Sequence, residues 1–247
     1  MSSYRHFAAV YDRLMRDVDY NARTDYLLRL FKEFGAVPTL LLDLACGSGG
    51  FSNLFSKKGI EVIGVDMSEE MLSVARQNSY DMGTDVLYLC QSAEKLDLYG
   101  TVDGAICCLD SLNHITDKEK LLAAVERVAL FLEKDCLFIF DVNTEYKHRE
   151  ILADNTFVID EDDLYCVWQN RFIPQKLTTE ITLDFFVKTG KFYTRSGERF
   201  FERAYTPAEL DEILKTAGFK IEAVYDDMTE NPPHDTSQRV VYVCRKS

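Results

Sequence analysis

A short apolar segment that runs into a glycine-rich turn limits the possible folds of this chain more than any other feature. Residues 39–44 read Thr-Leu-Leu-Leu-Asp-Leu, and Ala45-Cys46-Gly47-Ser48-Gly49 follows directly. A continuous apolar run of this length is typical of a parallel strand that is buried on both faces. Glycines let a backbone approach a ligand closely, and the helix predicted over 50–58 would offer unpaired N–H groups beside it. We therefore expect a ligand site at this turn.

The alternation of strand and helix continues to residue 142. Apolar runs predict further strands over 60–66, 86–90, 102–109 and 136–142. Helical spacing and capping residues predict helices over 20–34, after Ser68, and over 117–132. Strands that alternate with helices are joined by right-handed crossovers into an open, doubly wound parallel sheet.

The pattern changes after Val142. Residues 155–205 are rich in Phe, Tyr, Val, Ile and Thr without helical spacing, which predicts antiparallel strands. We expect them over 157–159, 165–168, 181–186 and 191–193, with a turn at Thr189-Gly190. A capping box at Thr206-Pro207-Ala208-Glu209 then opens a helix that ends before Gly218, and strands follow over 219–225 and 239–244. The predicted fold class is α/β: a Rossmann-like, doubly wound, mostly parallel seven-stranded sheet with an antiparallel β-rich insertion after strand five.

Composition and charge disfavour several classes of function. The chain is 47% hydrophobic and 28% charged, so it can bury a substantial core. Its net charge of −13 repels phosphate backbones, which disfavours nucleic-acid partners. Seven scattered cysteines lack the spacing of a zinc site and are expected to be reduced thiols in the core, so no metal is predicted. With no signal-peptide core and no membrane-length apolar stretch, we expect a cytoplasmic protein.

An acid at the end of the second strand suggests a ribose in the ligand. Asp66 follows Ala45 by about 20 residues, where a carboxylate can accept hydrogen bonds from both ribose hydroxyls. This pattern does not choose the nucleotide, because the segment from Ala45 to Gly50 also fits the glycine motif of a NAD-binding domain. Asp43 favours a cationic or amine-bearing ligand over a pyrophosphate.

Taken together, these motifs resemble those of the class I S-adenosylmethionine-dependent methyltransferases, particularly small-molecule-type bacterial members. Their acid-x-Gly-x-Gly-x-Gly motif is matched by Asp43-x-Ala45-x-Gly47-x-Gly49, with alanine for the first glycine. Further matches are the lead-in Leu40-Leu41-Leu42, the segment Gly64-Val65-Asp66-Met67-Ser68, Asp103-Gly104-Ala105-Ile106, Ala217-Gly218-Phe219 and the opening Phe7-x-x-x-Tyr11-Asp12. The resemblance is specific over 36–142, moderate over 206–244 and poor over 143–205. It implies three regions: an N-terminal helical lid over 1–35, a core over 36–143 and 206–247, and the insertion over 144–205 as a substrate cap.

The resemblance also implies roles for individual residues, with S-adenosyl-L-methionine as cofactor and a small molecule as acceptor. Asp43 would fix the loop, Asp66 would bind the ribose and Met67 would pack on adenine. The remaining expected cofactor contacts are Tyr11, Ala45, Cys46, Gly47, Gly49, Ser92, Ala93 and Leu109. Methyl transfer would be an in-line displacement, with Asp110, His114 and Tyr11 as candidate proton acceptors.

Each assignment has a simpler alternative. Asp43 could cap the next helix, Met67 could be core, and Tyr11 could be an ordinary helix residue. His114 could form only a local hydrogen bond. Trp168 and Arg171 could shape the acceptor pocket or only pack the insertion. The alternative functions are a NAD-dependent oxidoreductase, a non-catalytic S-adenosylmethionine-binding module and, against the charge, an RNA-modifying enzyme.

Overall fold

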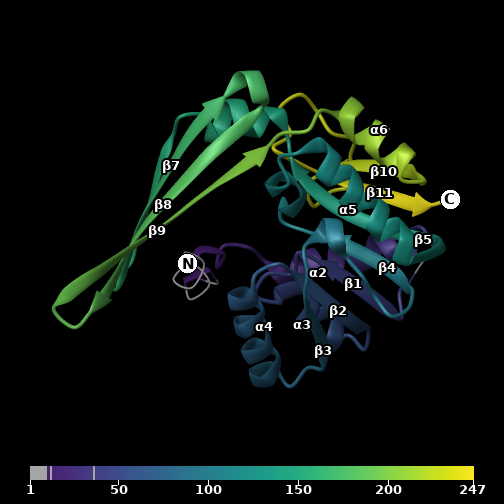
Figure 1. Cartoon of the computed structure of the whole chain (residues 1–247), viewed down its shortest axis with the longest axis horizontal. Helices are drawn as coiled ribbons and strands as arrows, with labels where there is room; N and C mark the ends of the chain where they lie inside the picture. The colour runs from purple at the N-terminus through teal and green to yellow at the C-terminus, as the bar shows by residue number, and fades with distance from the viewer. Residues whose placement is uncertain (1–9, 12, 36) are drawn as a thin grey trace.

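A seven-stranded sheet covered by helices on both faces forms the centre of the molecule (Figure 1). The computed structural model describes residues 10, 11, 13–35 and 37–247. The strand order is β10-β11-β5-β4-β1-β2-β3, and every neighbouring pair is parallel except the two pairs that contain β11. The strands are β1 (Leu40–Leu44), β2 (Glu61–Asp66), β3 (Val86–Cys90), β4 (Val102–Cys107), β5 (Leu132–Asn143), β10 (Phe219–Asp226) and β11 (Arg239–Lys246). The predicted fold class is confirmed.

The alternation of side chains along the central strands explains the two layers of helices. Leu41 of β1 packs with α2 and α3 on one face, whereas Leu42 and Leu44 pack with α5 and α6 on the other. The helices are α2 (Tyr20–Glu33), α3 (Gly50–Lys57), α4 (Glu69–Met82), α5 (Lys118–Phe131) and α6 (Pro207–Thr216). Because both faces of β1 are buried, its sequence is a continuous apolar run rather than an alternating one.

The capping residues act as predicted. The Ser68 side chain accepts a hydrogen bond from the backbone N–H of Met71, and Thr206 and Glu209 form a complete capping box. Among the strand boundaries that differ from the prediction, those of β4 and β5 have a visible cause. β4 ends at Cys107 rather than at 109, because Leu109 and Asp110 adopt φ angles of 57° and 54°, which a strand cannot contain. β5 begins at Leu132, where its pairing with Val102 of β4 begins.

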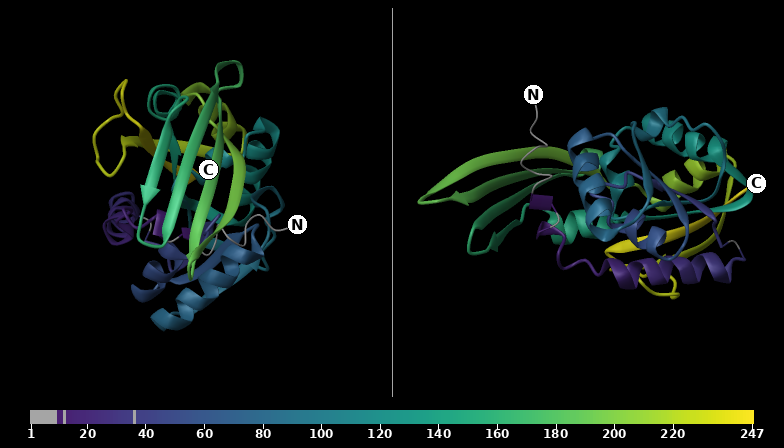
Figure 2. Two further views of the ribbon diagram at one scale, coloured as in Figure 1. Left: turned by 90° about the vertical axis from the view of Figure 1, so that its left-hand side faces the viewer. Right: turned by 90° about the horizontal axis from the view of Figure 1, so that it is seen from below.

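The insertion is a four-stranded antiparallel sheet that extends from one end of the core (Figure 2). Its strands are β6 (Thr156–Asp160), β7 (Leu164–Ile173), β8 (Thr178–Thr189) and β9 (Phe192–Arg203). The hairpin turn is Gly190-Lys191 rather than Thr189-Gly190, because Thr189 still pairs with Phe192. Strand β9 is much longer than the predicted 191–193. Its charged residues include Arg195, which forms an ion pair with Asp184 of β8.

Asn113 joins both ends of the insertion to the core. Its side-chain amide donates to the carbonyl of Asn143 (3.1 Å) and to that of Arg203 (2.8 Å). Its oxygen accepts from the backbone N–H of Asn143 at 2.9 Å. Asn143 is the last residue of β5 and Arg203 the last of β9, so one fully buried amide holds the exit and the return of the inserted chain.

Helix α2 packs on the central sheet. Tyr26, Leu27 and Phe31 are buried there in one cluster with residues of the sheet. Of the predicted opening motif, Phe7 and Asp12 lie outside the described residues. Whether the chain before α2 acts as a lid remains a prediction.

The cysteines follow the prediction with one clear exception. All seven are free, and Cys107, Cys108, Cys166 and Cys244 are buried as expected. Cys90 is exposed instead, because β3 is an edge strand of the central sheet. Across the described part of the chain, no helix combines the length and the apolar character needed to cross a membrane.

Candidate active site

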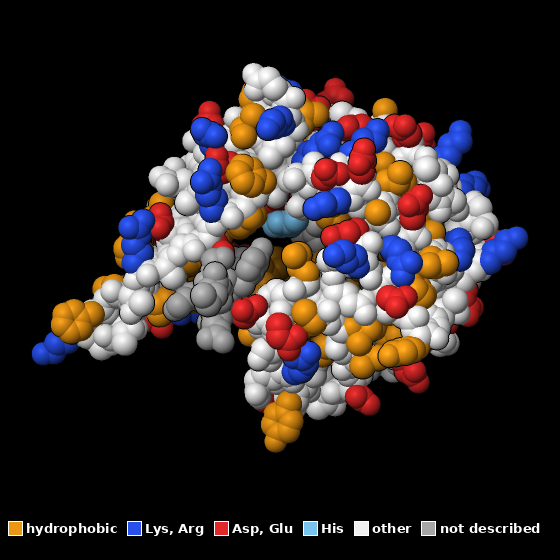
Figure 3. Space-filling model, viewed as in Figure 1, with side chains coloured by type: hydrophobic (Ala, Val, Ile, Leu, Met, Phe, Trp, Pro, Cys, Tyr) orange, Lys and Arg blue, Asp and Glu red, His pale blue; other side chains and the backbone are white. Residues whose placement is uncertain are grey.

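One cavity of about 420 Å³ lies between the carboxyl edge of the central sheet and the insertion. In the space-filling view the molecule is hollowed between these two parts (Figure 3). Residues from the core, such as Ala45 and Asp66, line it together with residues from the insertion, such as Trp168 and Glu202. In an open α/β sheet this edge is where ligands bind.

Asp66 connects the two turns that enclose the core side of the cavity. Its Oδ2 accepts from the backbone N–H of Gly47 at 2.9 Å, and its Oδ1 accepts from that of Ser68 at 2.8 Å. Burial raises the pKa of Asp66, and these backbone N–H groups oppose that effect. A carboxylate has about four acceptor positions, so these backbone N–H groups leave capacity for a ribose hydroxyl. Tyr11 lies beside this loop, with Cε1 3.9 Å from the position of a Cβ on Gly47.

Asp43 lies beneath the loop rather than in the cavity. It is 2% exposed, and its Oδ2 accepts from the Ser52 hydroxyl at 2.5 Å. It also accepts from the backbone N–H of Ser52, in the first turn of α3, whose N-cap residue Gly49 has no side chain for that purpose. Burial raises the pKa of Asp43 to about 7. The simpler alternative therefore describes the observed contacts: Asp43 anchors the start of α3 and so fixes the loop above it.

Gly49 is required by the space around it. Its φ is 78°, and a Cβ there would lie 2.3 Å from the Tyr88 hydroxyl oxygen. Ala45, the alanine in place of the family's first glycine, has a φ of 58° and keeps the same left-handed turn. The turn is thus preserved at both positions, although only one of them is a glycine.

The predicted site residues divide into two groups. Those that line the cavity are Tyr11, Ala45, Gly47, Asp66, Met67, Ala93, Leu109, Asp110 and His114. Those outside the lining are Asp43, Cys46, Gly49 and Ser92. Met67 is 71% exposed, which excludes the core alternative. Ser92 is replaced in the lining by its neighbours Gln91 and Ala93 and by Glu94, of which Gln91 and Glu94 were not predicted.

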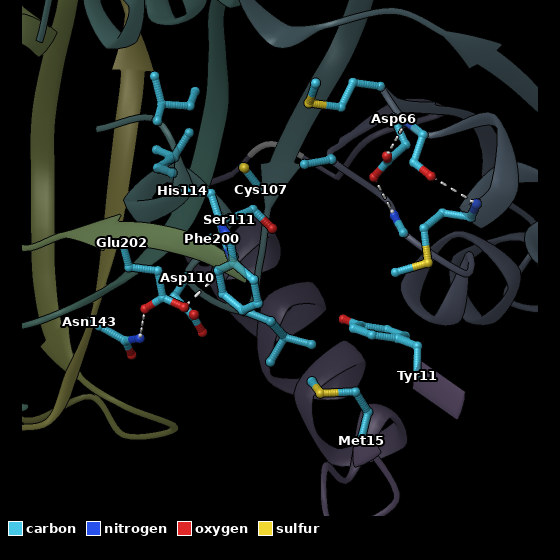
Figure 4. Close-up of a pocket in the computed structure, with 18 of the residues that line it drawn as sticks. Tyr11, Met15, Asp66, Cys107, Asp110, Ser111, His114, Asn143, Phe200 and Glu202 are labelled. Carbon is cyan, nitrogen blue, oxygen red and sulfur yellow. Dashed lines mark hydrogen bonds and ion pairs between the residues drawn. The ribbon is translucent and has the colours of Figure 1, made fainter. Parts of the chain in front are cut away.

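A cluster of ionisable groups lies at the other end of the cavity from Asp66 (Figure 4). One ligand atom from each of Asp110, His114 and Glu202 lies within 4.8 Å of the others. His114 makes no hydrogen bond through its side chain to any other described residue, and its ring packs on Phe200 with centroids 5.1 Å apart. Its Nε2 lies 3.7 Å from Oε1 of Glu202. The alternative of a purely local hydrogen bond is therefore wrong for His114.

Arg239 holds Asp110 in place from the far strand β11. Its Nη2 lies 2.5 Å from Oδ1 of Asp110, and its Nη1 pairs with Asp141. Asp141 also accepts from the backbone N–H groups of Leu109 (2.8 Å) and Asp110 (2.7 Å), which fixes the left-handed turn after β4. Burial alone would raise the pKa of Asp110, but Arg239 and Lys147 outweigh it and lower the pKa. Neither Arg239 nor Asp141 was predicted as a site residue.

Glu202 is the main addition to the predicted site. It lies near the end of β9 and is 4% exposed, and burial together with Asp110 raises its pKa to about 7. Asn143 donates to its Oε2 at a long 3.4 Å, and Nε2 of His148 lies 4.0 Å from the same oxygen. Residues 194–205 were not placed in any predicted element. The alternation Glu198, Phe200, Glu202 along β9 was the available signal.

Trp168 and Arg171, the two insertion residues whose role the sequence left open, occupy different environments. Trp168 lines the cavity, and its Nε1–H donates to Oδ1 of Asn170 at 2.6 Å, so its ring offers the cavity an apolar surface. Arg171 is outside the lining and pairs with Glu180 at 3.1 Å. Of the two, only Trp168 can shape an acceptor pocket.

Similarity to known proteins identifies the chemistry of this cavity. Residues 41–132, which contain the loop and Asp66, match the family model described as "Methyltransferase domain". A Bacillus subtilis protein with the name "Putative methyltransferase YqeM" is 33% identical over 245 residues, covering 99% of this chain and 97% of the relative. The chain belongs to the class I S-adenosylmethionine-dependent methyltransferases. Its cofactor is S-adenosylmethionine, and the NAD-dependent and non-catalytic alternatives are set aside.

Solved structures place the whole methyltransferase, insertion included, in this fold. An S-adenosylmethionine-dependent methyltransferase from Clostridium acetobutylicum superposes with a TM-score of 0.90 at 32% identity, covering 100% of both chains. CalS10 of Micromonospora echinaspora, described as an amino pentose methyltransferase, superposes with a TM-score of 0.77 at 17% identity, covering 96% of this chain and 97% of its own. The sugar N-methyltransferase KedS8 of Streptoalloteichus gives the same TM-score of 0.77 at 18% identity, with 96% and 93% covered.

Proposed function

We propose that this methyltransferase methylates a small molecule that binds beneath the insertion, and that residues 144–205 serve as its substrate cap. The observation that carries the proposal is the continuity of the cavity. The same cavity is lined by the cofactor loop at Ala45 and Gly47 and by Trp168 and Glu202 of the insertion. An acceptor enclosed in this way is held in one orientation and screened from water, which is what in-line displacement requires.

The core side of the cavity would hold the cofactor. Asp66 has free acceptor positions for the ribose, and exposed Met67 offers an apolar surface for adenine. Ala45, Gly47 and Leu109 would border the methionine moiety, with Tyr11 closing over Gly47. When bound, the cofactor supplies a methyl group on a sulfonium, so the chain need not activate the leaving group.

The candidate proton acceptors differ in the contacts that their side chains already make within the protein. Asp110 is paired with Arg239, and the ring of Tyr11 lies against the loop at Gly47. His114 and Glu202 face the cavity without a direct hydrogen bond between them at 3.7 Å. We therefore assign proton acceptance to His114 or Glu202 and a positioning role to Asp110.

A small acceptor fits the surface better than a nucleic acid. The net charge of −13 supplies no attraction for a phosphate backbone. Two proteins of the same fold, CalS10 and KedS8, are described as methyltransferases of an amino pentose and of a sugar nitrogen. Their low identity supports only the general class of small molecule. We also propose that the enzyme works in the cytoplasm, where such acceptors are made.

The test is transfer of a labelled methyl group to a fractionated metabolite extract. We expect label in a small-molecule fraction and about 10- to 100-fold weaker cofactor binding by Asp66→Ala, which loses charge-assisted hydrogen bonds. Asp97→Ala, with its carboxylate exposed and paired with Arg127, is the control. Label in RNA or protein fractions, or cofactor binding unaffected by Asp66→Ala, would contradict the proposal.

A further inference from the structure

The charges at the acceptor end of the cavity do not balance. Asp110 and Asp141 share the guanidinium of Arg239. Nζ of Lys147 donates to the amide oxygen of Asn143 at 2.9 Å and lies within 4.0 Å of no carboxylate among the described residues. Glu202 has no Lys or Arg of the described chain within that distance either. It is therefore a buried carboxylate that lines a cavity, and Lys147, the cation that acts on it through space, makes no direct ion pair with it.

Two imidazoles approach Glu202 but neither completes its hydrogen bonds. Nε2 of His114 is 3.7 Å from one carboxylate oxygen and Nε2 of His148 is 4.0 Å from the other. His148 is fully buried, its Nδ1 is engaged with the Thr179 hydroxyl at 2.8 Å, and its Nε2 has no hydrogen-bond partner among the described residues. Burial lowers the pKa of His148 to about 4, so it carries no charge near neutral pH. Buried ionised groups that lack a partner are costly, and such a group on a cavity wall is expected to find its partner in a ligand.

The wall above Glu202 is apolar. Phe200 precedes Glu202 on the same face of β9, and Leu183 and Trp168 line the cavity from β8 and β7. Ile159, Cys166 and Leu14 continue this surface. The indole N–H of Trp168 is already engaged by Asn170, so this wall offers a ligand contact area rather than hydrogen bonds.

We propose that the methyl acceptor is an amine carried on an apolar body, which binds as its ammonium ion with Glu202 as counter-ion and gives its proton to Glu202. This inference rests on the proposed function and names the substrate class for it. The ammonium would lie between Glu202 and His114, and the apolar body would lie along Phe200, Trp168 and Leu183. A phosphorylated or carboxylated acceptor in this position would instead meet the carboxylate of Glu202, since Arg239 is occupied by two acids and Lys147 is engaged by Asn143.

The proton and the electrons balance in this step. The ammonium N–H bond breaks, its proton goes to Glu202 and its electron pair stays on nitrogen. That pair forms the bond to the methyl carbon as the carbon–sulfur bond breaks, and the electrons of the broken bond stay on sulfur. The product is a methylated ammonium ion, and the proton on Glu202 passes to water after product release. A Glu202 pKa of about 7 lies close enough to neutral pH for the carboxylate both to take and to release a proton.

A divalent metal is the main competitor for this cluster. Arg239 lies against Asp110, and Lys147 is a second, half-buried cation close enough to lower the pKa of Asp110. Their positive charges oppose a dication, whereas a single ammonium restores neutrality to the three carboxylates and two cations.

The experiment measures binding of matched probes to the full chain saturated with S-adenosylhomocysteine, by calorimetry. The probes are 2-phenylethylamine, its isosteric alcohol 2-phenylethanol, the anion phenylacetate, and ethylamine without the ring. We expect the amine to bind about 10- to 100-fold more tightly than the alcohol, since a charge-assisted bond is lost in the alcohol. Phenylacetate and ethylamine should both bind more weakly than phenylethylamine.

Variants assign the effect to one side chain. Glu202→Gln should remove the preference for amine over alcohol and leave the ratio of S-adenosylmethionine to S-adenosylhomocysteine affinity unchanged. Glu180→Gln, which alters a carboxylate paired with Arg171 and Arg199 outside the cavity lining, should keep the preference. The wild-type probe series needs no variant, so it decides the question even if Glu202→Gln fails to fold.

Several results would overturn the inference. They are an alcohol or anion bound as tightly as the amine, no binding by any probe, a preference that survives Glu202→Gln, or an amine preference that requires added Mg²⁺ or Mn²⁺. A change in the ratio of cofactor to product affinity, with the amine preference intact, would assign Glu202 to the sulfonium instead. The proposed function fails separately, through loss of label transfer to all small molecules.

Discussion

Asp43 makes the stability of this enzyme depend on pH in a way that one substitution can isolate. Its carboxyl group is 2% exposed, and burial raises its pKa to about 7. In the unfolded chain a carboxyl group of this type has a pKa of about 3.9. The folded chain therefore keeps a proton on Asp43 that the unfolded chain releases, and stability falls as pH rises between these two values.

The magnitude follows from the two pKa values. A difference of about 3 units corresponds to about 4 kcal/mol, lost between about pH 4 and pH 7 and constant above. The amide introduced by Asp43→Asn cannot titrate but keeps an acceptor for Ser52, so this variant escapes the loss. The free energy of unfolding of Asp43→Asn relative to the unsubstituted chain should therefore rise by about 2 kcal/mol between about pH 5.5 and pH 8.5.

Urea denaturation at several pH values, followed by far-ultraviolet circular dichroism, measures this difference. Fluorescence is less suitable because the single tryptophan, Trp168, lies in the insertion and not beside Asp43. The control is Asp25→Asn, an exposed carboxylate paired with Lys58. A difference between Asp43→Asn and the unsubstituted chain that stays flat across this range would refute the reasoning, because Asp43 would then be ionised in the folded state.

Three further predictions concern stability. Gly49→Ala should lower the free energy of unfolding by about 2–4 kcal/mol, since it combines a strained φ with a Cβ 2.3 Å from the Tyr88 hydroxyl. The control Gly190→Ala has a similarly strained φ but no atom within 4 Å of the new Cβ, and should lower it by about 1 kcal/mol. Equal losses for the two variants in urea denaturation would contradict the steric argument. Arg239→Met should lower the free energy of unfolding by about 3–5 kcal/mol, because it leaves the carboxylates of Asp110 and Asp141 unpaired. Adding Asp110→Asn should restore part of this stability. No recovery in the double variant would argue against pairing as the cause. Thr206→Ala should cost about 1 kcal/mol through loss of the capping box without changing cofactor affinity by calorimetry.

The central fold was predictable because its signals are local. A strand buried on both faces, such as β1, has a continuous apolar sequence, and the caps at Ser68 and Thr206 act within three residues. The position of Asp66 was equally accessible, since the strand-to-turn pattern places an acid at the end of β2 whatever lies elsewhere. The sequence offered the contacts of Asp43 only as one of two alternatives, because the choice between them depends on how α3 is seated above it.

The acceptor end of the site depends on contacts between distant segments. Arg239 reaches Asp110 across 129 residues of sequence, and nothing near either residue indicates the pairing. Glu202 was missed because β9 carries charges on its outward face, so its sequence lacks the apolar run that identified the other strands. Outward charges are common on exposed antiparallel sheets. The residues to which we assign the acceptor are therefore those that single-sequence patterns reveal least.

The attachment of the insertion through Asn113 has a consequence for how the insertion of this enzyme can vary. Because the inserted chain leaves and returns at one buried amide, its length and surface can change without displacing the strands that carry the cofactor loop. Under the proposed function the insertion brings both Trp168 and Glu202 to the cavity, so its surface could vary and change the acceptor as long as Glu202 is kept. Acceptor choice would then be an exchangeable trait on a constant cofactor-binding core.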